Sequence, residues 1–258
     1  MDVIVTAGGM PRPDESLYAL TQGGYKAMLD LHGKPMIQWV IDALTGAPSV
    51  EKIVVVGLPV FTDLVTDKPL TIIPDQGEML ANFKSGVDEL LKTNPNLQQV
   101  LACSSDIPTI TSEHVEWMIQ RVLESDDDLY YNVIERSVME ARFSGSKRTY
   151  LRLKDVEVCG GDLNAIRASM VDEDNPLYHR LLDARKSTLR QAALLGYDTL
   201  LLLLTRQRTL ADAARIASSR LHLSGRAILC PYAEMGMDVD KPHQLELVRA
   251  DLARQKVA

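Results

Sequence analysis

A glycine-rich segment near the start of the sequence has the composition of an anion-binding loop. It is the heptapeptide TAGGMPR, residues 6–12, and it directly follows a strand predicted at residues 3–5. Gly8 and Gly9 lack a Cβ, so backbone N–H groups can approach an anion closely, and Arg12 can neutralise phosphate charge. The segment lacks the third glycine of the dinucleotide fingerprint and the Gly-Lys-Ser/Thr of a P-loop. On these residues alone, phosphate binding and a tight turn both remain open.

Two aspartates that are far apart in the sequence each lie next to a predicted element. Asp106 follows a strand predicted at residues 99–103, and ligands of an open α/β sheet bind beyond the carboxyl ends of its strands. Asp240 precedes the last predicted helix, and Asp238 lies two residues earlier. In an extended segment both side chains would face the same way. Asp106 could instead cap a turn, and Asp240 could cap the helix.

The elements that must position these residues predict an α/β fold. Strands are expected at residues 3–5, 52–56, 70–73, 99–103, 129–134 and 226–230, and helices at 35–44, 78–91, 112–123, 176–195, 209–221 and after 242. This alternation predicts three layers, α/β/α, around a mostly parallel, Rossmann-like sheet. From about residue 135 the regular alternation of strands and helices ends. Residues 150–153 and 156–158 predict a small excursion from it, a group of antiparallel strands, and a helical pattern follows near Leu163. We expect one domain over residues 1–258, with a subregion at about 135–225.

The composition excludes several classes of protein. The 258 residues include 28 Lys and Arg against 35 Asp and Glu, a net charge of −7, so no nucleic-acid partner is expected. Cys103, Cys159 and Cys230 are too far apart for a zinc or redox motif, which favours a reducing, cytoplasmic location. The start resembles no signal peptide, and the longest apolar run, residues 200–204, suits core or interface rather than a membrane helix of roughly 20 residues.

The segments GYKAML (residues 24–29) and GKPMI (residues 33–37) extend the pattern. In this order the motifs resemble the MobA-like NTP transferases, a nucleotidyltransferase family with a GT-A-like fold whose N-terminal pattern is Ala-Gly-Gly, Arg, Pro-Lys and then Gly-Lys-Pro. The resemblance implies that Ala7, Gly8 and Gly9 wrap a triphosphate. It also implies that Arg12 and Lys26 are catalytic, because they would bind the phosphates and stabilise the departing pyrophosphate.

The resemblance assigns both aspartates to a metal site and also marks departures from the family pattern. Asp106 and Asp240 would hold Mg²⁺, which relieves the repulsion between the triphosphate and an incoming phosphate. Asp238 could be the second ligand in place of Asp240, and we favour Asp240 because it matches the position of the family's ligand. Lys241 stands where the family has threonine. Pro11 replaces a family glycine and removes a backbone donor, and Tyr25 replaces a proline.

Two further regions would complete the site by the same resemblance. The nucleotide base would lie on the segment with Gln76, Gly77 and Asn82. The acceptor would bind at a later group of residues: Lys147, Arg148, Gly161, Asp162 and Asn164. A basic pair suits a phosphorylated acceptor, although Lys147 and Arg148 could equally be an exposed loop. Asp162 stands where relatives often have asparagine.

The implied activity is a Mg²⁺-dependent transfer of a nucleoside monophosphate from a nucleoside triphosphate to a small phosphorylated acceptor, with release of pyrophosphate. The acceptor phosphate is already an anion, so no histidine base is needed. The chain could also form a homo-oligomer. Two alternatives stay open: a nucleotide-binding module of the same fold that has lost catalysis, and a glycosyltransferase that uses a nucleotide sugar. The second would need a closely spaced acidic metal motif, whereas Asp106 stands alone in its segment.

Overall fold

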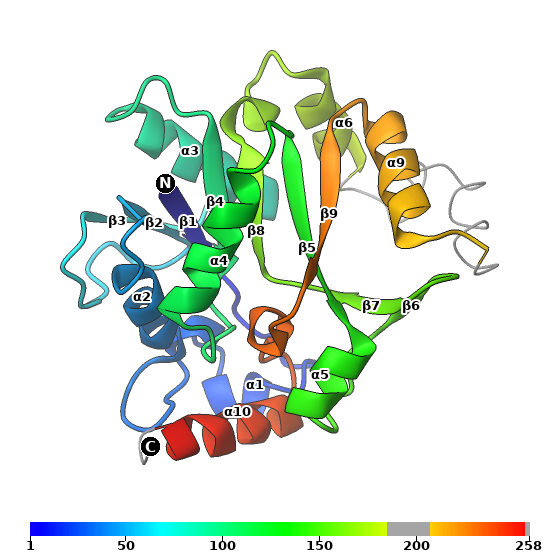
Figure 1. The fold of residues 1–258 in the computed structure, drawn as a ribbon. Coiled ribbons are helices and arrows are strands. Elements are labelled where there is room, and N and C mark those ends of the chain that lie inside the picture. Colours follow the sequence, from blue (N-terminus) through cyan, green and yellow to red (C-terminus); the bar gives the residue numbers. More distant parts are fainter. Residues whose placement is uncertain (185–206, 256–258) are drawn as a thin grey trace.

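A single sheet organises residues 1–184 and 207–255, which the computed structural model describes (Figure 1). Its strand order is β3-β2-β1-β4-β8-β5-β7-β6, with β9 beside β5. The strands are β1 Asp2–Thr6, β2 Ile53–Val56, β3 Leu70–Ile73, β4 Gln99–Ser104, β5 Leu129–Glu135, β6 Leu151–Arg152, β7 Glu157–Gly160, β8 Leu163–Arg167 and β9 Gly225–Cys230. Strands β1 to β4 pair in parallel, as do β5 and β9. Strands β7 and β8 run against their neighbours. The predicted mostly parallel α/β fold with an antiparallel excursion is confirmed.

The helical pattern expected near Leu163 is wrong, because these residues form strand β8. Leu163 and Ala165 are fully buried, whereas Asn164 and Ile166 between and after them are only partly buried. This period of two is that of a strand. The segment that follows the glycine pair is too short for its apolar residues to show whether they recur with the period of a helix or with that of a strand.

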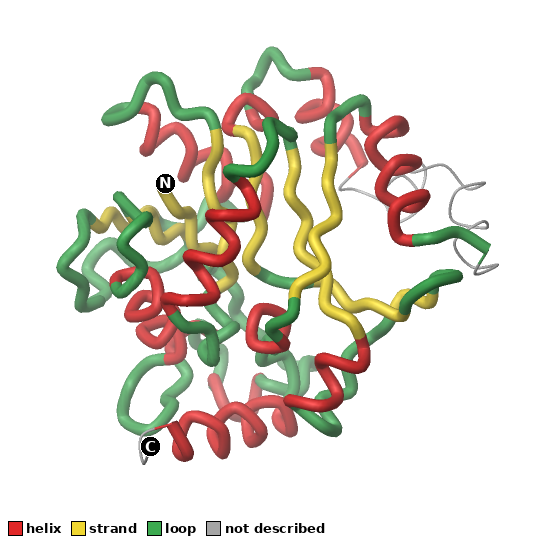
Figure 2. Tube along the Cα trace, in the orientation of Figure 1, coloured by secondary structure: helices red, strands yellow, loops and turns green. Residues whose placement is uncertain are grey.

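Helices cover both faces of the sheet (Figure 2). They are α1 Tyr18–Thr21, α2 Met36–Thr45, α3 Met79–Leu91, α4 Ser112–Val122, α5 Arg136–Arg142, α6 Pro176–Ala184, α9 Leu210–Leu221 and α10 Pro242–Gln255, with 3₁₀ helices η1 Lys26–Met28, η2 Ala168–Val171 and η3 Ala233–Gly236. The end of the helix predicted at 176–195 and the apolar run 200–204 lie outside the described residues. Within residues 1–184 and 207–255, each helix is too short or too polar to span a lipid bilayer.

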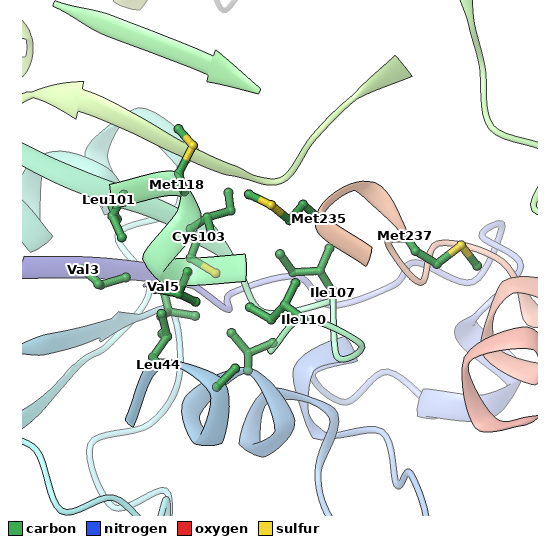
Figure 3. Close-up of a cluster of buried hydrophobic side chains, with 14 of the residues drawn as sticks. Val3, Val5, Leu44, Leu101, Cys103, Ile107, Ile110, Met118, Met235 and Met237 are labelled. Atoms are coloured by element: carbon green, nitrogen blue, oxygen red, sulfur yellow. The ribbon is translucent and has the colours of Figure 1, made fainter. Parts of the chain in front are cut away.

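The alternation of side chains along β1 produces the three layers. Val3 and Val5 belong to one buried cluster, together with Leu44 of α2 and Met118 of α4 (Figure 3). Ile4 belongs to a second cluster, on the face that α3 covers. Because successive strand residues point to opposite faces, the continuous apolar stretch at residues 3–5 must be covered on both sides of the sheet.

The sheet brings segments from both ends of the chain together at the carboxyl ends of β1 and β4. These strands are adjacent and parallel, with Thr6 in register with Ser104. Beyond them, the N–H of Ser105 donates to the Thr6 carbonyl at 3.1 Å, and the N–H of Val239 donates to the Asp106 carbonyl at 3.0 Å. The segment that precedes α10 is therefore fixed beside the segments that follow β1 and β4.

Candidate active site

The glycine-rich segment leaves β1 and is braced by the neighbouring strand. The N–H of Ala7 donates to the Val56 carbonyl at 2.8 Å. Gly57 has a φ of +113°, and a Cβ at this residue would lie 2.2 Å from the nitrogen of Gly8. Only glycine fits there, so the backbone after β2 limits the position of Gly8. Gly57 was not predicted as a site residue, although a glycine close to the end of a buried strand is also part of the signal that identified Gly8.

Replacing Gly57 with alanine is expected to destabilise the protein by about 2 kcal/mol or more, because backbone strain of roughly 1–3 kcal/mol adds to the overlap with Gly8. Urea denaturation measures the change in the free energy of unfolding. Gly9→Ala is the matched control, since a Cβ at Gly9 meets no atom within 4 Å. Equal unfolding midpoints for the two variants would contradict the conclusion that the backbone at Gly57 limits the position of Gly8.

Lys26 joins the two aspartates that were predicted to bind a metal ion. Its backbone N–H donates to the Gly9 carbonyl at 2.8 Å, which ties η1 to the glycine-rich segment. Its Nζ lies 2.5 Å from Asp106 Oδ2 and 2.7 Å from Asp240 Oδ1. The structure therefore brings Lys26, Asp106 and Asp240 to one point.

The charges of this group reinforce one another. Burial lowers the pKa of Lys26, but the two carboxylates outweigh burial and raise that pKa above its ordinary value. Burial raises the pKa of Asp240, yet the hydrogen bond and charge of Lys26 hold it below its ordinary value. The Ser104 hydroxyl donates to the other oxygen of Asp106 at 2.5 Å. At neutral pH the group thus holds an ammonium ion and the ionised carboxylate of Asp240.

Arg148 forms an ion pair with Asp238, the alternative to Asp240 as the predicted metal ligand. The side chain of Arg148 is 14% exposed and forms an ion pair with Asp238. The guanidinium also donates to the Gly160 carbonyl at 3.1 Å and lies 3.7 Å from Asp162. Asp238 therefore faces an arginine and Asp240 faces Lys26, a difference that the sequence could not show. Arg148 lies inside the site and is no exposed loop residue.

Asp162 can present both a donor and an acceptor near neutral pH. Burial raises its pKa to about 8, aided by the charges of Asp106 and Asp238 and opposed by Arg148. A protonated carboxyl group carries one O–H donor and retains acceptor capacity, as the amide of asparagine does. When protonated, Asp162 can therefore make the same kinds of hydrogen bond as the asparagine that relatives often have at this position.

Arg12 lies apart from the group around Lys26. Its side chain is 72% exposed and pairs with Glu15 at 3.3 Å and with Asp14 at 3.7 Å. The phosphate contact expected of Arg12 stays a prediction, and it would require the arginine to leave these carboxylates.

Asn82 supports the segment that was predicted to contact the base. It is buried, accepts from the Gln76 N–H at 2.7 Å and donates to Asp75 Oδ1 at 2.7 Å. Gly77 in this segment has a φ of +84°. Both ends of the Asn82 amide hold the segment in place, and base contacts by Gln76 and Gly77 remain a prediction.

The remaining acceptor candidates divide into an exposed residue and a structural pair. Lys147 is exposed and has a φ of +54°. Asn164 accepts from the Asn132 N–H at 2.8 Å and donates to the Gly161 carbonyl at 3.0 Å. A Cβ at Gly161 would lie 2.6 Å from the Asn132 side chain. Asn164 and Gly161 thus connect β8 to β5, and acceptor binding by them stays a prediction.

A pocket of about 500 Å³ opens beside the Lys26 group. Its lining comes from the glycine-rich segment, the chain before α1, the first residue of η1 and the two residues before α10: Gly9, Met10, Pro11, Glu15, Ser16, Leu17, Lys26, Asp240 and Lys241. A larger hollow of about 690 Å³ between α5 and the β6–β7 hairpin is lined by none of the predicted site residues. The first pocket is therefore the better candidate for a ligand-binding site, because predicted site residues line it.

Asp106 and Asp240 fit the requirements of Mg²⁺. Their oxygens contact the same cationic atom, so they can face one metal ion, and carboxylate oxygens are the ligands that this ion takes. Over residues 1–184 and 207–255, no group of three or more His, Cys, Asp or Glu is arranged to hold a metal ion. The other ligands would have to be water and substrate phosphates, as is common for Mg²⁺.

A comparison of the sequence with protein families matches residues 3–220 to the family described as the MobA-like NTP transferase domain. The chain belongs to the MobA-like NTP transferase family. A hypothetical transferase from Thermus thermophilus is 33% identical, with a TM-score of 0.80 over 95% of this chain and 98% of that one. No protein with a curated description matches in sequence.

More distant members of this fold are cytidylyltransferases. A CMP:2-keto-3-deoxy-manno-octonic acid synthetase complexed with CTP has a TM-score of 0.56 at 16% identity, over 98% of this chain and 99% of that one. The 4-diphosphocytidyl-2C-methyl-D-erythritol synthase of Anaerococcus prevotii has a TM-score of 0.58 at 10% identity, over 98% and 97%. At these identities the likeness concerns the fold alone. Family membership makes the protein an NTP-using nucleotidyltransferase and confirms the resemblance found in the motifs.

Proposed function

We propose that the protein transfers a nucleoside monophosphate from a nucleoside triphosphate to a small phosphorylated acceptor and releases pyrophosphate. The observation that carries this proposal is the meeting of Lys26, Asp106 and Asp240 beside the glycine-rich segment. It combines a phosphate-binding cation, two oxygen ligands for a metal ion and a loop with exposed backbone at Gly9.

In the proposed reaction an oxygen of the acceptor phosphate attacks the α-phosphorus. A new P–O bond forms there, the bond from the α-phosphorus to the bridging oxygen breaks, and pyrophosphate leaves with that electron pair. The reaction needs positioning and charge neutralisation more than proton transfer. The ammonium of Lys26 would exchange its carboxylates for phosphate oxygens and stabilise the negative charge on the leaving group. Mg²⁺, when bound by Asp106 and Asp240, would supply further positive charge to the phosphates.

The residues around Arg148 support an acceptor site on the other side of the aspartates. Arg148 would remain with Asp238, keeping that carboxylate away from the metal ion. Asp162, with its pKa raised to about 8 by burial and neighbouring carboxylates, could donate to the acceptor when protonated. A partly neutralised wall of this kind repels an acceptor phosphate less than ionised carboxylates would.

The proposal is tested by offering ATP, GTP, CTP or UTP with Mg²⁺ and a panel of phosphorylated sugars and alcohols. Pyrophosphate release and mass spectrometry of the linked product are the readouts. One triphosphate is expected to react and to raise the melting temperature most, since a ligand at 100 times its Kd stabilises by about 2.7 kcal/mol. Selective binding without pyrophosphate release would instead favour an inactive module. Release of a nucleoside diphosphate from a sugar nucleotide would favour a glycosyltransferase.

A further inference from the structure

The pocket beside the glycine-rich segment is short of available positive charge. Its lining contains two acidic residues, Glu15 and Asp240, and two lysines, Lys26 and Lys241. Lys26 is held by two carboxylates at 2.5 and 2.7 Å. A polyphosphate that enters this pocket would therefore meet no net attraction from the four charged side chains together.

Arg12, the basic residue of the glycine-rich segment, does not relieve this shortage. Arg12 pairs with Glu15 and Asp14 and is absent from the pocket lining, whereas Glu15 is part of it. The position of Glu15 in the wall disfavours a polyanion unless another cation faces the same space.

Lys241 meets this requirement. Its carbonyl accepts from the N–H groups of Gln244 and Leu245 at 3.0 and 3.1 Å, which fixes its backbone at the start of α10. Its side chain is exposed, lines the pocket and makes no ion pair or side-chain hydrogen bond within residues 1–184 and 207–255. The backbone is thus held at the rim while the ammonium group stays available for a ligand.

We propose that Lys241 binds the terminal phosphates of the nucleoside triphosphate, an inference that rests on the proposed function. Lys241 shares the pocket with Gly9 and Met10 of the glycine-rich segment, whereas Arg148 and Asp162 are not part of its lining. This places Lys241 on the nucleotide side of the site. It supplies the charge that Arg12, engaged by Glu15, does not supply to the pocket.

The test compares Lys241→Met with the wild type by isothermal titration calorimetry. The ligands are inorganic tripolyphosphate, the four nucleoside triphosphates and the four monophosphates, each with Mg²⁺. We expect Lys241→Met to bind tripolyphosphate about tenfold more weakly than the wild type does, which corresponds to ~1.4 kcal/mol. The same loss is expected for the nucleoside triphosphate that the wild type binds. Monophosphate affinity should be unchanged, and Lys241→Arg should keep the wild-type affinities. Lys92→Met is the matched control, because Lys92 is also exposed but lies at the end of α3, away from the pocket.

An unchanged affinity for tripolyphosphate, or an equal loss for the monophosphates, would overturn the assignment of Lys241. A wild type that binds neither tripolyphosphate nor any triphosphate would overturn it too. The proposed function fails separately: tripolyphosphate binding that depends on Lys241, together with no transfer to any acceptor, would leave the assignment standing and reject the transferase reaction. Lys241→Met should unfold at the wild-type temperature, since its side chain is exposed.

Discussion

Asp106→Asn is expected to lower kcat/KM by about 10²–10³ or more while the protein remains folded, an effect similar to the loss of one group that stabilises a transition state. The substitution removes a carboxylate that contacts Lys26 at 2.5 Å and that faces the same point as Asp240. An amide is a poor ligand for Mg²⁺ compared with a carboxylate, so the affinity for the ion in the presence of nucleotide should fall as well. Initial rates of pyrophosphate release measure the first effect, and titration with Mn²⁺ measures the second.

The control for this variant is Asp88→Asn. Asp88 also accepts a hydrogen bond from a lysine, Lys84, at 2.7 Å, but it lies on α3, and neither Asp88 nor Lys84 is a predicted site residue. Its loss should leave the rate of transfer unchanged. If Asp106→Asn keeps full magnesium-dependent activity, the assignment of Asp106 as a metal ligand is rejected.

Lys26→Met is expected to have two opposite effects. Transfer should slow by about 10²-fold or more, because the leaving pyrophosphate loses a cation. Binding of Mn²⁺ to the nucleotide-free protein should instead become about tenfold tighter or more, equivalent to ~1.4 kcal/mol. The reason is that the ammonium of Lys26 contacts both Asp106 and Asp240, and a divalent ion must displace it. Electron paramagnetic resonance of free Mn²⁺ measures this affinity without any turnover.

Lys84→Met separates this competition from a general change in charge. Lys84 is 20% exposed and faces Asp88 and Glu173, so it resembles Lys26 in exposure and in having two acidic neighbours. It should leave both the rate and the Mn²⁺ affinity unchanged. Equal Mn²⁺ affinity of Lys26→Met and wild type would show that the lysine does not compete for the two carboxylates.

The fold could be predicted from the sequence wherever a buried strand forms a continuous apolar run. Residues 53–56 are such a run, and residues 129–134 are apolar except for Asn132; both predicted strands are present in the structure. Strand β8 could not be found in this way, because it is inserted antiparallel between β4 and β5 and only alternate residues are buried. Its partner strands lie far away in the sequence, and pairing over such distances leaves no local signal.

The site was predictable in its residue types and less so in its contacts. Asp106 and Asp240 each follow or precede a recognisable element, and the sheet topology brings them to one point. The ion pair between Arg148 and Asp238 depends on where two loops meet, which no local pattern encodes. The orientation of Arg12 depends on Glu15, three residues away, whose competing charge outweighs the simple expectation that a basic side chain faces the loop.

The close approach of Gly57 to Gly8 also bears on the thermodynamics of ligand binding. A flexible loop must give up conformational freedom when it wraps a ligand, and that cost reduces the affinity. Here the backbone after β2 already confines Gly8 when the chain folds. The glycine-rich segment is thus preorganised at this residue, and little of the interaction energy with a ligand should be consumed in ordering it.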